Sequence, residues 1–109
     1  MYSRITLLEF DPLRFDVGDA LLRFEASVLP ALQEQPGYEG ALVLANDEAK
    51  GMVVTLWASR DAADAALASG FWAAQVEQFV TLFRAPPGRD GYDVVYMVTP
   101  AVVSAGAVR

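Results

Sequence analysis

The strand-like segment over residues 51–59 is apolar on both of its faces, which limits the folds open to the chain. Successive side chains of a strand point to opposite faces of a sheet. One face carries Met52, Val54, Leu56 and Ala58. The other face carries Val53, Thr55, Trp57 and Ser59. Residues 92–98 repeat the pattern. Two helices cover one face of a sheet, so the other must meet a further surface, most simply the same face of a second copy. We therefore expect a homodimer.

The first part of the chain contains one strand and one long helix. Residues 3–10 are predicted to form a strand that ends at the turn signal of Asp11 and the following proline. Apolar residues then recur at helical spacing, from the N-cap residue Asp16 to the Pro36 stop. Pro30 lies inside this helix and has no backbone N–H, so we expect it to bend or split the helix.

The second part repeats this organisation. Residues 38–45 and 51–59 should pair as an antiparallel hairpin. Ser59 is placed to cap a second helix, which we expect to break at Gly70 and then to continue as an apolar stripe to Phe83. Residues 85–88 should stop this helix, and the last strand is predicted over residues 92–98. The order strand, helix, strand, strand, helix, strand predicts a ferredoxin-like α+β fold, with a four-stranded antiparallel sheet and helices on one face. We expect one domain over residues 1–99 and a tail over 100–109.

Composition excludes several classes of function. The 109 residues include no His and no Cys, which removes disulfides, thiolate nucleophiles, the usual zinc sites and all imidazole chemistry. We therefore expect no metal, flavin or haem cofactor. The net charge of -6 argues against nucleic acid and anionic membranes as partners. The chain has no apolar run long enough to span a membrane and no secretory signal, so we expect a cytoplasmic protein.

Two short motifs resemble a known family. The first helix runs into Pro36-Gly37-Tyr38-Glu39-Gly40, and the third strand ends in Trp57-Ala58-Ser59 before the acidic helix start Asp61-Ala62. This pattern resembles the antibiotic biosynthesis monooxygenase-like group of dimeric α+β barrel proteins, and the resemblance covers the chain to about Thr99. The group holds oxygenases, haem-degrading enzymes and members with no assigned activity. The resemblance therefore implies the fold more strongly than the chemistry.

The resemblance carries functional residues over one at a time. Members that degrade haem use a His and a Trp where this chain has Val76 and Ala66, so the resemblance implies no haem degradation. Members that oxidise aromatic polyketides without a cofactor carry a Trp on the third strand, which Trp57 matches. They also carry an Asn and an Arg, which here fall at Val53 and near Glu77. The resemblance thus implies a pocket around Trp57.

Trp57 is the candidate catalytic residue, because both the residue pattern and the resemblance point to it. The candidate substrate-binding residues contribute aromatic rings or hydroxyl groups: Tyr38, Thr55, Ser59, Phe71, Trp72 and Tyr96. Phe71 and Trp72 follow the expected helix break and could form a lid. The alternative for each residue is structural, as core packing, a helix cap or a dimer contact. Arg4 and Arg84 are interpreted as surface residues, and no metal site is predicted.

Two functions of different classes remain open. The first is a cofactor-independent monooxygenase of small aromatic or polyketide-like compounds. Such chemistry needs no His, Cys or metal, because an easily ionised hydroxylated aromatic can pass an electron to dioxygen in a shaped apolar pocket. The second is a non-catalytic small-molecule binding or interaction dimer of the same fold.

Overall fold

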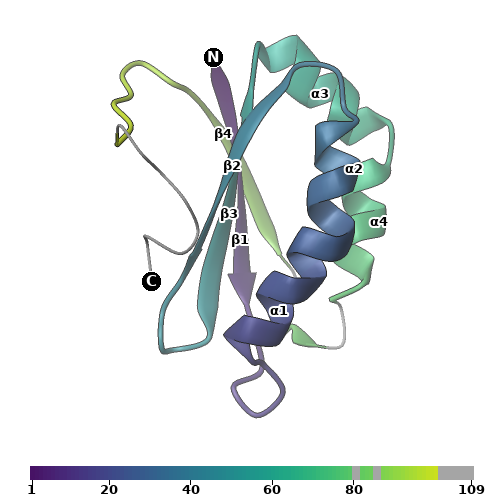
Figure 1. Ribbon diagram of the computed structural model, residues 1–109, viewed down its shortest axis with the longest axis vertical. Coiled ribbons are helices and arrows are strands. Elements are labelled where there is room, and N and C mark those ends of the chain that lie inside the picture. The colour runs from purple at the N-terminus through teal and green to yellow at the C-terminus, as the bar shows by residue number, and fades with distance from the viewer. Residues whose placement is uncertain (80–81, 85–86, 101–109) are drawn as a thin grey trace.

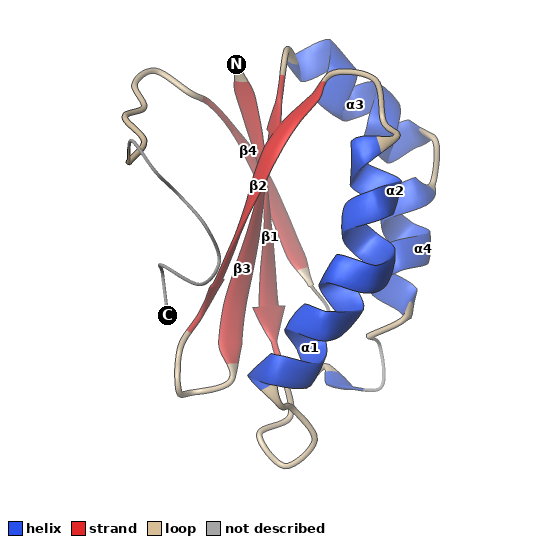
Figure 2. Cartoon of the chain, in the orientation of Figure 1, coloured by secondary structure: helices blue, strands red, loops and turns tan. Residues whose placement is uncertain are grey.

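The computed structural model describes residues 1–79, 82–84 and 87–100, and these residues form an antiparallel sheet with helices on one side of it (Figure 1). The strands are β1 (Tyr2–Glu9), β2 (Tyr38–Ala45), β3 (Lys50–Trp57) and β4 (Gly88–Asp93), in the spatial order β2-β3-β1-β4. The helical segments are α1 (Val17–Arg23), η1 (Phe24–Val28), α2 (Leu29–Gln33), α3 (Arg60–Ala68) and α4 (Phe71–Glu77) (Figure 2). The predicted ferredoxin-like α+β fold is confirmed.

The first helix is split by a wider turn, as Pro30 predicted. Asp16 caps α1 by accepting a hydrogen bond from the Asp19 N–H at 3.1 Å. The segment η1 is a π turn, in which the Leu29 N–H bonds to the Phe24 carbonyl five residues earlier. Pro30 lies in the first turn of α2, directly after the π turn. Because proline lacks an N–H and its ring crowds the preceding turn, the helix widens there instead of running on as a regular α-helix.

The second helical region follows its local signals at the start and departs from them at the end. Ser59 caps α3 by accepting from the Ala62 N–H at 3.1 Å, and Gly70 breaks the helix in a left-handed conformation with φ of +82°. The apolar stripe predicted a helix that continues to Phe83. Instead, α4 ends at Glu77, and Phe83 forms a β-bridge with Phe10. The helix prediction at Val80 falls outside the described residues, as does the tail beyond residue 100.

The last strand lies earlier in the chain than predicted. It was expected over 92–98, but β4 spans Gly88–Asp93. Its neighbour β1 explains the shift. Tyr2 of β1 pairs with Asp93, and the Val94 N–H donates to the carbonyl of Met1, the first residue of the chain. No residue of β1 is therefore left to pair with the residues that follow Val94. Residues 94–100 therefore have no strand assignment. β4 lies at the edge of the sheet. Its charged side chains suit this position, because charge on an edge strand disfavours pairing with a further strand.

The two faces of the sheet have different surroundings. The face toward the helices carries Val53, Thr55 and Trp57, all 6% exposed or less. The other face, here called the open sheet face, has no helix packed on it in the described structure (Figure 1). Strand pairing aligns two apolar rows across β2, β3 and β1 on this face: Leu44, Met52 and Leu7, and Leu42, Val54 and Ile5. Leu7, Leu42 and Leu44 are each about half exposed, at 49%, 55% and 50%.

Candidate functional site

A cavity of about 70 Å³ lies between the sheet and the helices. Side chains from β1, β2, β3, α1, η1 and α4 line it, and nearly all of them are apolar. The described lining residues that carry a polar side-chain group are Thr6, Gln75 and Trp72. An apolar space with a few polar groups is the usual form of a small-molecule site.

The π turn and an aromatic cluster shape this cavity. Phe24 and Val28, at the two ends of η1, both line it. Phe10 stacks on Phe15 with ring centroids 4.0 Å apart, and its centroid lies 5.3 Å from that of Phe83. All three rings line the same cavity. π turns are frequent at functional sites, and here the turn supplies wall residues directly.

No described residue that lines the cavity is titratable. The cavity therefore has no carboxylate, amine or phenol among these residues to act as a general base. Tyr38 lies outside it, and burial raises the pKa of the Tyr38 hydroxyl above its usual value near 10, so this phenol stays protonated at neutral pH. Any ligand that reacts as an anion in the cavity must ionise by its own acidity.

Trp72 carries a buried donor with no hydrogen-bond partner. Its side chain lines the cavity, the residue is 9% exposed, and its Nε1 has no acceptor. An unsatisfied buried donor costs about 1–3 kcal/mol. A ligand with an oxygen acceptor would remove that cost, so Trp72 is the strongest candidate in the cavity for orienting a polar ligand.

Trp57, the predicted catalytic residue, is 3% exposed and belongs to the hydrophobic core. Its indole N–H donates to the Thr55 hydroxyl at 2.9 Å, and that hydroxyl donates to the Arg4 carbonyl at 3.3 Å. Its ring makes edge contacts with Tyr38 and Phe71, at centroid distances of 6.1 and 6.5 Å. Trp57 lines a second, smaller void of about 20 Å³ beside the larger cavity.

The structure brings some of the predicted site residues together. Thr55, Phe71 and Trp72 line the small void with Trp57, and Trp72 alone of the predicted set lines the larger cavity. Ser59 is exposed as the cap of α3, and Tyr96 is 83% exposed after the end of β4. Their roles in substrate binding, and that of Trp57 in catalysis, stay predictions.

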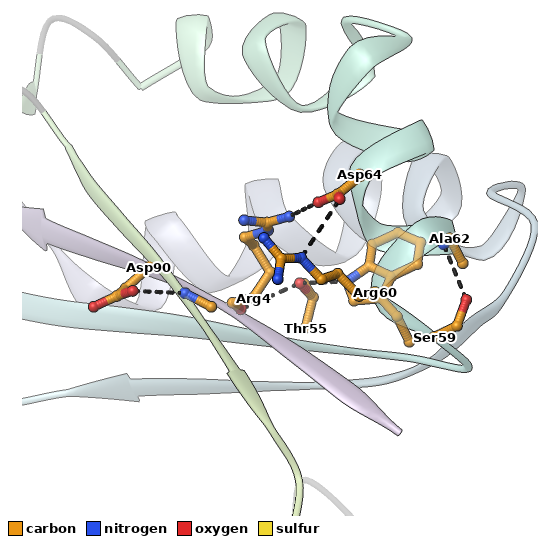
Figure 3. A network of polar contacts seen from close by, with 9 residues as sticks. Arg4, Thr55, Ser59, Arg60, Ala62, Asp64 and Asp90 are labelled. Atoms are coloured by element: carbon orange, nitrogen blue, oxygen red, sulfur yellow. Dashed lines mark hydrogen bonds and ion pairs between the residues drawn. The ribbon is translucent and has the colours of Figure 1, made fainter.

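Arg4, interpreted as a surface residue, is partly buried in the structure. Its side chain is 20% exposed, its Nη2 donates to Asp64 at 2.5 Å, and its guanidinium lies 5.5 Å from the Tyr2 ring centroid (Figure 3). Arg84 is 62% exposed, as expected. No local pattern indicates this environment of Arg4, because its partner Asp64 comes from α3, far along the chain. The cavity-lining Thr6 and Gln75 were missed for the same reason.

Among comparisons with known proteins, only the one with solved structures finds matches to this chain. No protein-family model matches the sequence, and no curated protein matches it either. A solved protein of unknown function from Nitrosomonas europaea is 24% identical, with a TM-score of 0.69 over 93% of this chain and 95% of its own. The cofactor-independent oxygenase SnoaB from Streptomyces nogalater is 12% identical, with a TM-score of 0.70 over 91% and 97%.

A third solved structure, a monooxygenase from Streptomyces coelicolor in complex with the ligand nanaomycin D, is 17% identical, with a TM-score of 0.68 over 92% of each chain. At such identities the likeness shows a shared fold. No helix in the described part of the chain is long and apolar enough to cross a membrane. The chain therefore has the α+β fold of the antibiotic biosynthesis monooxygenase proteins, as its motifs implied.

Proposed function

We propose that the protein binds small aromatic or polyketide-like molecules in the cavity between sheet and helices and oxidises them with dioxygen, without a cofactor. The observation that carries the proposal is the cavity itself, whose apolar lining holds one unpartnered indole donor. The fold shared with SnoaB and with the nanaomycin-bound monooxygenase supports the same class of reaction.

The lining limits the chemistry to substrates that ionise unaided. Such an anion transfers one electron to dioxygen, and the resulting radical and superoxide combine as a carbon-bound peroxide. Protonation of the peroxide and loss of water leave a carbonyl, so that one CH₂ group and one O₂ become one C=O and one H₂O. In this scheme Trp72 and Thr6 hold the anion by hydrogen bonds, and the apolar walls strengthen those bonds.

The cavity must widen to admit a substrate. Its volume of about 70 Å³ is about half the ~150 Å³ of an engineered cavity that holds benzene. The aromatic cluster of Phe10, Phe15 and Phe83 lines the cavity, and rotation of these rings would enlarge it. Binding by displacement of side chains is therefore part of the proposal.

A homodimer formed through the open sheet face is also part of the proposal. The two apolar rows across β2, β3 and β1 leave Leu7, Leu42 and Leu44 about half exposed. A second copy offers the same surface and buries both rows at once. The expected mass in solution is twice the 11.8 kDa of the chain, which light scattering measures directly, and a single chain at micromolar concentration would contradict it.

A specific observation favours the non-catalytic alternative. No titratable group of the described residues lines the cavity, and Val53 and Glu77 occupy the positions where the resembled oxygenases carry Asn and Arg. A protein that only binds its ligand needs neither group. Calorimetry with anthrone- and quinol-type compounds, run beside an oxygen electrode, separates the two functions, because binding without oxygen uptake identifies the binding protein.

The matched variants Trp72→Phe and Trp57→Phe test which indole serves the reaction. Each removes an N–H and keeps an aromatic ring, but only Trp72 lines the larger cavity. If Trp72 holds the substrate anion, its variant loses about tenfold or more in kcat/KM. If Trp57 is the catalytic residue, its variant shows that loss instead. An equal, small effect of both variants would contradict a role for either N–H.

A further inference from the structure

A groove of about 550 Å³, here called the hairpin-end groove, lies on the open sheet face at the end next to the β2–β3 hairpin. Its lining includes the apolar row of Leu7, Leu44 and Met52. Gly88 of β4 also lines it, and a Cβ at this position would lie 3.7 Å from that of Leu7. A larger side chain at position 88 would therefore fill space in the groove. Three lining residues have polar side chains: Glu9, Asn46 and Lys50.

A run of exposed apolar residues follows β4. Residues 94–98, here called the C-terminal arm, have no strand assignment. Within the arm, Val95, Tyr96, Met97 and Val98 are 90%, 83%, 48% and 75% exposed. After β4 the chain leaves the sheet on the side away from the helices, which is the side of the open sheet face (Figure 1). Four consecutive exposed apolar side chains are unusual on a free surface and indicate a contact surface.

The arm and the groove lie at opposite ends of the sheet. The arm follows Asp93, which pairs with Tyr2, whereas Gly88 at the groove pairs with Leu7. Tyr2 and Leu7 are five residues apart on β1, or roughly 17 Å at about 3.4 Å per residue. To reach the groove of its own chain, the arm must reverse direction at once, yet it contains no Gly, Pro, Asn or Asp, the residues that favour tight turns. A two-fold axis across the open sheet face, perpendicular to the strands, instead brings each arm to the groove of a second copy.

The proposed dimer needs more contact surface than the apolar rows supply. The two rows across β2, β3 and β1 contain six residues of each chain, whereas a stable interface has about 20–30 residues on each side. An uncharged arm in each groove enlarges the interface on both copies. Tyr96 suits a groove of mixed lining, because a tyrosine ring packs on apolar side chains while its hydroxyl bonds to polar groups. Tyrosine is also enriched among the residues that dominate binding energy at interfaces.

We infer that the C-terminal arm of each chain binds in the hairpin-end groove of its partner, with Tyr96 as the main anchor. The inference rests on the homodimer proposed above and adds the two surfaces that meet at the ends of its interface. The occupant of the groove is thus a segment of a second copy of this chain. In this arrangement Tyr96, predicted from the sequence as a substrate-binding residue, contacts the partner on the side of the sheet opposite the substrate cavity.

Cross-linking between single cysteines tests the contact directly, because the chain has no cysteine of its own. A Tyr96→Cys chain and a Gly88→Cys chain, one of them carrying a mass tag, are co-expressed and treated with a short bismaleimide. We expect a covalent heterodimer. The matched control pairs Tyr96→Cys with Leu13→Cys, at a residue that is 95% exposed and outside the groove lining, and should give no heterodimer. A link formed only within a chain that carries both Tyr96→Cys and Gly88→Cys would place the arm on its own chain and overturn the inference.

Substitutions in the groove and in the arm test what the contact contributes to affinity. Gly88→Leu fills the groove and Tyr96→Ser removes the anchor, so each should raise the dimer dissociation constant about tenfold or more in sedimentation, whereas Leu13→Ser should change it by less than about twofold. If Gly88→Leu fails to fold, Tyr96→Ser and the cross-links decide. An unchanged dissociation constant in Tyr96→Ser, or a wild-type dimer without the heterodimer cross-link, would overturn the arm assignment and leave the homodimer standing. A monomeric wild type would overturn both, and oxygen uptake is measured independently of either result.

Discussion

The two tryptophans allow a matched test of hydrogen-bond energetics in one core. Trp57 and Trp72 are 3% and 9% exposed, and replacing either with Phe removes a similar part of an indole ring. The two N–H groups differ in one respect. That of Trp57 donates to Thr55 at 2.9 Å, whereas that of Trp72 has no partner.

This difference sets the expected magnitudes. Trp57→Phe loses a buried hydrogen bond, which costs about 1–3 kcal/mol beyond the loss of ring volume. Trp72→Phe removes an unsatisfied donor, so its ring loss is offset by a gain of similar size. We expect the Trp57 variant to be less stable than the Trp72 variant by about 2–6 kcal/mol, because the loss in one variant and the gain in the other add, or by about 8–24 °C in melting temperature for a domain of this size.

The assay is thermal unfolding of both variants and wild type in buffer without ligand, followed by circular dichroism and repeated with denaturant. Equal destabilisation by the two substitutions would refute the reasoning, since it would mean that the Trp72 N–H is satisfied in the free protein.

Three further predictions concern the interface, a turn and a surface pair. Leu44→Arg places a charge on the open sheet face and should convert the proposed dimer to a monomer in sedimentation, whereas an unchanged dimer would place the interface elsewhere. Gly37→Ala should destabilise the fold by about 1–3 kcal/mol in denaturant titration, because Gly37 has a φ of +83° and an added Cβ would lie 2.6 Å from that of Ala62. The Tyr92 hydroxyl bond, foremost among several causes, lowers the pKa of Asp90, so Tyr92→Phe should raise that pKa in an NMR titration. Because the pKa of Asp90 is lower in the folded protein than in the unfolded chain, the contribution of the Asp90–Tyr92 pair to stability is present above the unfolded pKa and is lost as the pH falls through the folded pKa. An unchanged Asp90 titration in the Tyr92→Phe variant would contradict this role for Tyr92.

Local signals predicted most of the fold. Asp16 and Ser59 cap helices because a short polar side chain before an apolar stripe satisfies free backbone donors, and this depends only on neighbouring residues. Gly70 breaks a helix for an equally local reason. Phe83 and the start of β4 were misplaced because their positions depend on pairing with Phe10 and β1, from the opposite end of the chain.

The candidate site was predictable only in part. Alternation along β3 correctly placed Thr55 and Trp57 on one face, and the bond between them follows from that placement. The same alternation could not show that Ser59 turns outward as a cap or that Tyr96 lies beyond the last paired residue. Arg4 was missed because its environment is built by residues from α3 and α4, which no pattern within β1 encodes.

The π turn of the first helix has a consequence for how sequences of this kind can change. A π turn holds one residue more than the α-helical turn it replaces, so its simplest origin is a single-residue insertion. Pro30 fits directly after that wider turn, where a regular helix would clash with its ring. The extra residue and the proline are thus mutually dependent. Deleting Ala26 alone would bring Pro30 into conflict with the restored α-helical turn, while deleting it together with Pro30→Ala would relieve the conflict. A lineage could therefore cross between the straight and the widened helix more easily by changing both positions than by changing the first alone.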